Sequence, residues 1–246
     1  MKERALLLGS LIVLSPELVY GMHISEGILP LKWALFWWLI TAVILGLALR
    51  GVRNFLMDDL QRKALFTFVT AFIFLISLIP IPVPIAGTSS HPVGVATGVF
   101  VLGVCGSIVA GFIVLLLQAF LLAHGGLSTL GANTLAMAVI GSLSAYLVIL
   151  LLQRTPFPLY VKAFISGAVA NWATYLVTAL QLSLALKGDE PLEVFLIKTI
   201  LAFMPTQLPM GIIEGVITAS VVTAIAKKRG DLMVSKYLNL REGVVK

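Results

Sequence analysis

The uncharged run from Pro92 to His124 is the feature that most restricts how this chain can fold. As one straight α-helix it would extend about 48 Å, whereas the hydrocarbon core of a bilayer is about 30 Å thick. A soluble domain of this size has no need for so long a stretch without charge. The run therefore predicts a membrane protein in which this segment bends, with Gly103 and Gly106 as the favoured corner because glycine tolerates the required backbone angles.

The composition of the 246-residue chain also indicates a membrane protein. Hydrophobic residues make up 59% of it, charged residues make up 11%, and the mean hydropathy is +1.06. The fold class expected is all-α, a polytopic membrane helical bundle with seven transmembrane helices in one domain, residues 22–246. The expected spans lie near 31–49, 64–79, 92–104, 107–123, 133–152, 162–186 and 194–226. The third and fourth are short for full spans.

The charges orient this bundle. The chain has 17 Lys and Arg against 11 Asp and Glu, a net charge of +6. In a membrane protein such an excess marks cytoplasmic loops, and we expect no nucleic-acid partner. Seven spans put the basic loops and the basic tail on the inner side: Arg50, Arg53, Arg62, Lys63, Arg154, Lys162, Lys227, Lys228 and Arg229. The mature N-terminus and all three histidines, His23, His91 and His124, then face outside.

Residues 1–21 have the layout of a cleavable secretory signal peptide, with a charged start, an apolar stretch of about ten residues and a small residue, Gly21, at the cut. Cleavage there would give Met22 a free amine with a pKa of about 7.7. The Met22 amine, the His23 amide and the His23 imidazole could then hold one metal ion in a plane. Planar nitrogen donors suit Ni(II), Cu(II) and, less well, Co(II).

His91 is the expected fourth nitrogen of this site. Three prolines stiffen the chain ahead of it, and a predicted helix follows directly, so the loop can present the imidazole in a fixed direction. The hydroxyls of Thr88, Ser89 and Ser90 precede it and can orient the ligands.

Four further polar residues are expected to act without ligating the metal. His124 ends a helix, where an imidazole can cap loose carbonyls and support the loop. Asn133 opens the next helix and can cap it or bond into the site. Glu26 could offset the charge of the ion or bond the His23 imidazole, or it could simply face solvent. Glu214 interrupts an apolar span and predicts a packing or coupling role.

Three motifs together resemble the CbiM/NikM family, the substrate-specific membrane components of energy-coupling-factor transporters for cobalt or nickel. They are Met22-His23-Ile24-Ser25-Glu26-Gly27, Gly87-Thr88-Ser89-Ser90-His91-Pro92, and the stretch from Gln118 to Asn133 that contains His124-Gly125-Gly126. The similarity runs from Met22 to Gly215. The family often carries Met where this chain has Ser25, which leaves the nitrogen donors unchanged.

The resemblance implies seven spans, removal of the leader, and a square-planar metal site made by the Met22 amine, the His23 amide and imidazole, and His91. It also implies a CbiQ-type transmembrane coupling protein and CbiO-type ATPases as partners, with or without a small CbiN-type membrane protein. The location expected is a prokaryotic plasma or inner membrane, in the lipid bilayer.

The function expected is therefore import of Co(II) for cobalamin biosynthesis, or of Ni(II) in the same role, with no permanent cofactor. We expect no enzyme activity, because the glycines from Gly126 to Gly131 lack the Lys and the Ser or Thr of a nucleotide-binding loop. Two other interpretations stay open: an integral-membrane metalloenzyme or haem protein, and a self-sufficient channel or secondary transporter.

Overall fold

The computed structural model describes residues 23–56, 60–78, 81–82 and 89–234. The predicted leader 1–21 with its cleavage position, Met22 and Thr88 lie outside these residues. Two short strands, β1 Ile81–Pro82 and β2 Ser89–Ser90, pair antiparallel. The helices are α2 Leu31–Leu56, α3 Leu60–Ser77, α4 Val95–Leu122, α5 Leu130–Asn133, the π-helix η2 Thr134–Ile140, α6 Gly141–Leu152, α7 Leu159–Leu186, α8 Leu192–Arg229 and the 3-10 helix η3 Gly230–Leu232.

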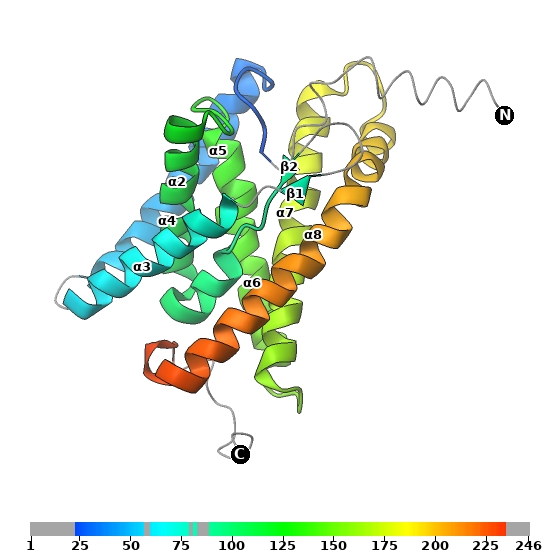
Figure 1. The fold of residues 1–246 in the computed structure, drawn as a ribbon. Helices are drawn as coiled ribbons and strands as arrows, with labels where there is room; N and C mark the ends of the chain where they lie inside the picture. The colour runs from blue at the N-terminus through cyan, green and yellow to red at the C-terminus, as the bar shows by residue number, and fades with distance from the viewer. Residues whose placement is uncertain (1–22, 57–59, 79–80, 83–88, 235–246) are drawn as a thin grey trace.

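Six helical segments of this described part are long and apolar enough to cross a membrane: α2, α3, α4, the continuous run α5–η2–α6, α7 and α8. Figure 1 shows α2 and α3 on one side of the bundle and α7 beside α8 on the other. The all-α membrane bundle is thus confirmed, but seven full spans are not. The difference lies in the run from residue 92 to residue 123.

Helix α4 is broken at Gly103, whose backbone angles of φ 74° and ψ 178° are not helical. The first arm, Val95–Leu102, then folds back along the second: Ser107 Oγ donates to the Val95 carbonyl at 2.7 Å, and a Cβ on Gly111 would lie 3.2 Å from Val95 Cγ1. An eight-residue arm rises only about 12 Å, too short to cross a bilayer. The expected span over 92–104 is therefore half a span, entered by non-helical chain.

The break still reverses the chain direction, as the sequence predicted for this region. Cys105, directly after the corner, lies beside Gly51 near the far end of α2. Both ends of the broken segment consequently return to one end of the bundle, where His91 precedes it and His124 follows it. Non-helical backbone is tolerated at this depth because protein surrounds it: His91 and Val93, in the non-helical chain before α4, are both buried.

The outer face of the bundle is apolar, as a lipid-facing surface requires. On α2, exposed side chains recur every four residues, at Leu31, Leu35, Leu39, Val43 and Leu47. This spacing forms one stripe along the helix. The stripe is what lipid tails would cover, which supports a multi-pass membrane protein.

Many polar side chains lie in the interior, and some of them bond to the backbone of neighbouring helices. Gln181 Nε2 donates to the Ala132 carbonyl at 3.1 Å, and Thr174 Oγ1 donates to the Ala136 carbonyl at 3.1 Å. Both acceptors lie in the α5–η2 run, where the π-helical stretch departs from regular α-helical bonding. The bonds from α7 thus hold an irregular helix in place inside the bundle.

Candidate metal centre

The chain that follows His23 is clamped at Ile24 by two polar side chains. The Ile24 N–H donates to Asn133 Oδ1 at 2.9 Å, while its carbonyl accepts bonds from Asn133 Nδ2 at 3.0 Å and Thr129 Oγ1 at 2.7 Å. Thr129 and Asn133 are four residues apart, which places them on one face of the helix start. His23, Ile24, Thr129 and Asn133 are all buried. The clamp therefore fixes the direction in which the chain presents His23.

A tight turn at the end of α4 brings in His124. The helix ends at Ala123, which has a left-handed φ of 50°, and the His124 N–H donates to the Gln118 carbonyl at 3.2 Å. Bonding of this kind satisfies the last carbonyls of a helix and sets the exit direction of the chain. His124 thereby points back to the bundle, next to the His23 ring.

Glu26 joins the two loops. Its N–H donates to the Gly125 carbonyl at 3.2 Å, and its Oε2 accepts a bond from the Ser128 N–H at 3.0 Å. A Cβ on Gly126 would lie 2.7 Å from the Glu26 Cα, so this close approach of the two backbones requires glycine. Glu26 is exposed, and its carboxylate is engaged with the backbone of the loop.

His91 follows β2 and has a defined ring orientation. Its Nδ1 lies 2.9 Å from the Pro92 carbonyl oxygen, and its Nε2 lies 3.0 Å from His23 Nε2. A carbonyl can only accept, so the first bond places the proton on Nδ1 and leaves the Nε2 lone pair facing His23. Histidine ligands are commonly fixed in this way, by a bond from the ring nitrogen that does not contact the metal.

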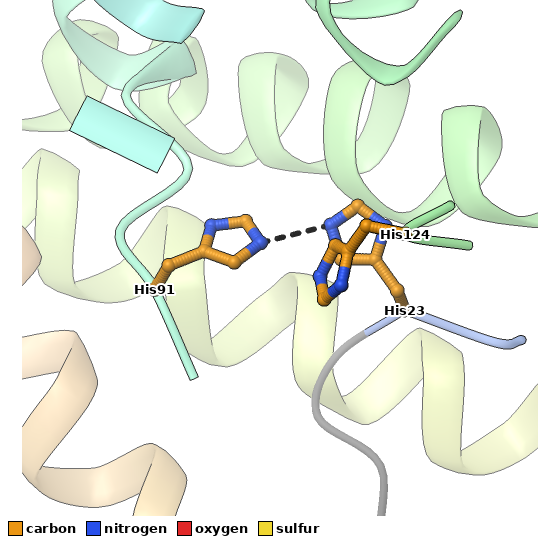
Figure 2. Close-up of side chains that lie close together, drawn as sticks. All are labelled: His23, His91 and His124. Carbon is orange, nitrogen blue, oxygen red and sulfur yellow. Dashed lines mark hydrogen bonds between the residues drawn. The ribbon is translucent and has the colours of Figure 1, made fainter. Parts of the chain in front are cut away.

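The three imidazoles form one cluster, drawn in Figure 2. One ring nitrogen from each lies within 4.8 Å of the others, and the ring centroids are 5.0 Å apart for His23 and His91, 4.3 Å for His23 and His124, and 5.3 Å for His91 and His124. Two nitrogens bound at a right angle to one metal, each at 2.0–2.1 Å, would be about 2.9 Å apart. The spacing between His23 and His91 fits this arrangement.

Burial keeps the cluster neutral. It lowers the pKa of His23 well below the ordinary value, helped by repulsion from His91 and His124. It lowers the pKa of His91 to about 4, against an opposing contribution from the bond to Pro92, and it lowers the pKa of His124 as well. Neutral imidazoles offer their lone pairs at neutral pH without competition from protons.

The structure places most of the predicted site residues at or beside the cluster of histidines. His23, His91 and His124 converge, and Asn133 bonds the segment that carries His23. Ser89 and Ser90 form β2, directly before His91. Sequence reasoning missed Thr129, although a Thr and an Asn four residues apart at a helix start is a recognisable pair.

The sequence profile of the CbiM family, described as the cobalt uptake substrate-specific transmembrane region, matches residues 23–232. The chain belongs to this family. A cobalt transport protein CbiM of Geobacter sulfurreducens is 44% identical over 92% of this chain, which spans 65% of that relative's length. Another CbiM, of Sorangium cellulosum, is 38% identical over 86% of this chain and 94% of the relative.

Two solved structures have the same fold as this member of the CbiM family. The crystal structure of a truncated transition metal transporter matches with a TM-score of 0.75 at 27% identity, covering 83% of this chain and 98% of the other. A second transition metal transporter matches with a TM-score of 0.74 at 29% identity, covering 83% and 92%. The resemblance to CbiM is confirmed, and the relatives' name as transport proteins fits the expectation of a transporter component and not an enzyme.

Proposed function

We propose that this chain is the metal-capturing membrane subunit of an ATP-driven energy-coupling-factor transporter that imports Co(II), with Ni(II) as the alternative substrate. The observation that carries the proposal is the convergence of the chain's three histidines: one ring nitrogen from each lies within 4.8 Å of the others, and His23 and His91 are buried. These residues come from three separate segments and meet at one end of the bundle. Chance burial of polar loop residues gives no reason for such convergence.

The ligands we propose are the Met22 amine, the His23 amide and imidazole, and His91, in a chain from which residues 1–21 have been removed and whose N-terminus faces outside. A six-membered chelate with the His23 amide would use Nδ1 of that ring, whereas Nε2 faces His91 in the structure. Metal capture in this arrangement therefore includes a rotation of the His23 ring. The clamp on Ile24 leaves the backbone of His23 in place while the ring turns.

His124 distinguishes this set from a site made of three imidazoles. In the proposed set it supports the loop through the turn at Ala123. In the competing set its nitrogen replaces the N-terminal donors, and no leader removal is needed. The proposed set requires the free Met22 amine and the competing set does not, so acetylation of that amine distinguishes the two.

Energy for import is proposed to come from CbiQ-type and CbiO-type partners, with or without a CbiN-type subunit, and the cobalt to supply cobalamin synthesis. The names of the relatives support cobalt as the substrate. Release inward would be aided by any movement that separates His91 from the N-terminal donors, because a cage with one donor fewer holds the ion more weakly.

The test is metal binding by the purified mature protein, with its N-terminus sequenced and its metal content measured. We expect one Co(II) or Ni(II) per chain, and a loss of affinity of at least about tenfold on acetylation of the N-terminal amine or on His91→Ala. Lys63→Gln, an exposed change near the start of α3, serves as the control.

Equal affinity after acetylation would refute the N-terminal ligands. Equal affinity in His91→Ala would refute the site as a whole. Uptake into vesicles by this chain alone, without ATP, would refute the dependence on partners and favour a self-sufficient transporter. A haem absorption band in the purified protein would favour the metalloprotein interpretation.

A further inference from the structure

Glu214 is a buried carboxylate that the metal site does not directly use. It lies in α8 with 1% of its surface exposed. Its two oxygens accept one backbone bond each, Oε2 from the Val93 N–H at 2.7 Å and Oε1 from the Gly94 N–H at 2.8 Å. Burying such a group in a membrane span is costly, so its retention calls for a specific reason.

The two amides need an acceptor. They lie at the start of α4, where the first N–H groups of a helix have no partner inside the helix. Gly94, the residue that caps α4, has a φ of 76° and provides no side-chain bond of its own. Glu214 therefore caps this helix from another helix, at its positive end.

One of these bonds leads directly to His91. The Pro92 carbonyl and the Val93 N–H belong to the same planar peptide unit. The carbonyl accepts from His91 Nδ1 at 2.9 Å, and the N–H donates to Glu214 Oε2 at 2.7 Å. The imidazole, the peptide and the carboxylate thus form an unbroken chain of hydrogen bonds.

This arrangement has two physical consequences for His91. Because the peptide unit is rigid, the carboxylate that holds one edge also sets the orientation of the carbonyl at the other edge. A carboxylate that accepts from the N–H also polarises the peptide and makes its carbonyl a stronger acceptor. Both effects hold the proton on Nδ1 and strengthen the Nε2 lone pair, as a directly bonded carboxylate does for metal-binding histidines.

We propose that Glu214 is the positioning residue for His91, acting through the peptide between Pro92 and Val93. The inference rests on the proposed function, in which His91 binds the metal. Glu214 does not touch the ion. It links α8 to the loop that carries His91, so a movement of α8 would also move His91 at the metal site.

A double-mutant cycle tests this. The variants are Glu214→Gln, His91→Ala and the two combined, with Ni(II) affinity measured by calorimetry on the purified mature protein. Glutamine keeps one acceptor oxygen but turns an amide NH₂ toward a backbone N–H, so we expect about tenfold weaker binding. If Glu214 acts through His91, the combined variant binds no more weakly than His91→Ala alone, because residues that act as a unit are non-additive.

Two further measurements separate positioning from general stabilisation. The visible absorption of bound Ni(II) reports the donor set, and in Glu214→Gln it should shift toward the spectrum of His91→Ala. Thr218→Val is the matched control: Thr218 lies one turn further along α8, is fully buried, and its hydroxyl has no hydrogen-bond partner among the residues that the structure describes. This control should bind Ni(II) with the wild-type affinity and spectrum.

Additive losses in the cycle, or an unchanged Ni(II) spectrum in Glu214→Gln, would overturn the positioning role while leaving the metal site intact. No loss in His91→Ala would instead overturn the proposed function. If Glu214→Gln does not fold, Glu214→Asp carries the same test, because it keeps the charge but is one methylene too short to reach both amides.

Discussion

Replacing Asn133 by Ala removes the clamp on the segment that carries His23. The change deletes both Asn133 bonds to Ile24 and leaves the buried Ile24 N–H without its acceptor, while the bond from Thr129 to the Ile24 carbonyl remains. In the mature chain that we propose, His23 is the second residue, so little besides this clamp would fix its backbone. Without it, His23 and Ile24 must be ordered when the metal binds.

The cost follows from the backbone entropy of these two residues. Fixing one residue costs about 1–2 kcal/mol, so ordering two costs about 2–4 kcal/mol. Because the Thr129 bond still restrains Ile24, we take the lower value, about 2 kcal/mol, which corresponds to about 30-fold weaker metal binding. Asn133→Asp should be at least as damaging, since it places a carboxylate oxygen against the Ile24 carbonyl where an N–H₂ donor lay.

The assay is calorimetric titration of the metal-free mature protein with Ni(II) and Co(II), alongside thermal unfolding in the same detergent. Ser142→Ala is the control: it also removes a fully buried polar group, whose hydroxyl donates to Ser107 Oγ at 3.0 Å and not to a histidine or to Ile24. It should lower the unfolding temperature without changing the affinity. The reasoning fails if folded Asn133→Ala binds within about twofold of wild type, or if Ser142→Ala loses as much affinity.

Four other predictions follow, of which two concern pH, one concerns His124 and one concerns the bend in α4. We expect the Ni(II) affinity to fall by about tenfold or more per pH unit between about pH 7.5 and 6. The pKa of His91 is about 4 and that of His23 lies well below its ordinary value, so this fall would come from the Met22 amine and the His23 amide. An affinity that stays constant over this range would assign the site to imidazoles alone. Because the pKa of His91 is lower in the folded protein than in the unfolded chain, the unfolded chain takes up protons first as the pH falls. The metal-free protein should therefore lose stability between about pH 6.5 and about 4. An unfolding temperature that is constant over this range would contradict the burial of the cluster. His124→Ala should weaken Ni(II) binding by less than His91→Ala does, as measured by calorimetry, and an equal loss would make His124 a ligand. Gly103→Ala should destabilise the protein by about 1–3 kcal/mol in detergent unfolding, because its backbone angles are open only to glycine, whereas Gly46→Ala, inside α2 with open space around it, should be neutral or stabilising.

Much of the architecture could be predicted from hydropathy alone. The six long apolar helices lie near their predicted ranges, because a lipid-facing helix must be apolar along its length and satisfy its own backbone. A bend was expected at Gly103 and Gly106, since a run of this length cannot cross a bilayer straight, and it lies at Gly103. The two helices that meet there were expected, but seven full spans are not confirmed: hydropathy does not distinguish a full span from a non-helical segment followed by a half-length helix that other protein surrounds.

The metal centre was predictable in part. His23 and His91 were proposed from the chemistry of a free amine beside an imidazole and from a stiff loop, and the structure brings both into one cluster. His124 was expected only to support the loop, and its proximity to the other two depends on the left-handed turn at Ala123. No local pattern reveals that turn in a residue other than glycine.

The sequence by itself determined that this chain lies in a membrane, that its long uncharged run turns back, and that its histidines fall at one end, because each of these follows from chain length, charge and the cost of burying polar groups. Only the tertiary structure decided which backbone groups the buried polar side chains hold. The clamp of Asn133 on Ile24 joins residues 109 apart, and the bond of Glu214 to Val93 joins residues 121 apart. Such pairs form when separate helices pack, and a hydrogen bond between them depends on distances that no stretch of sequence encodes on its own.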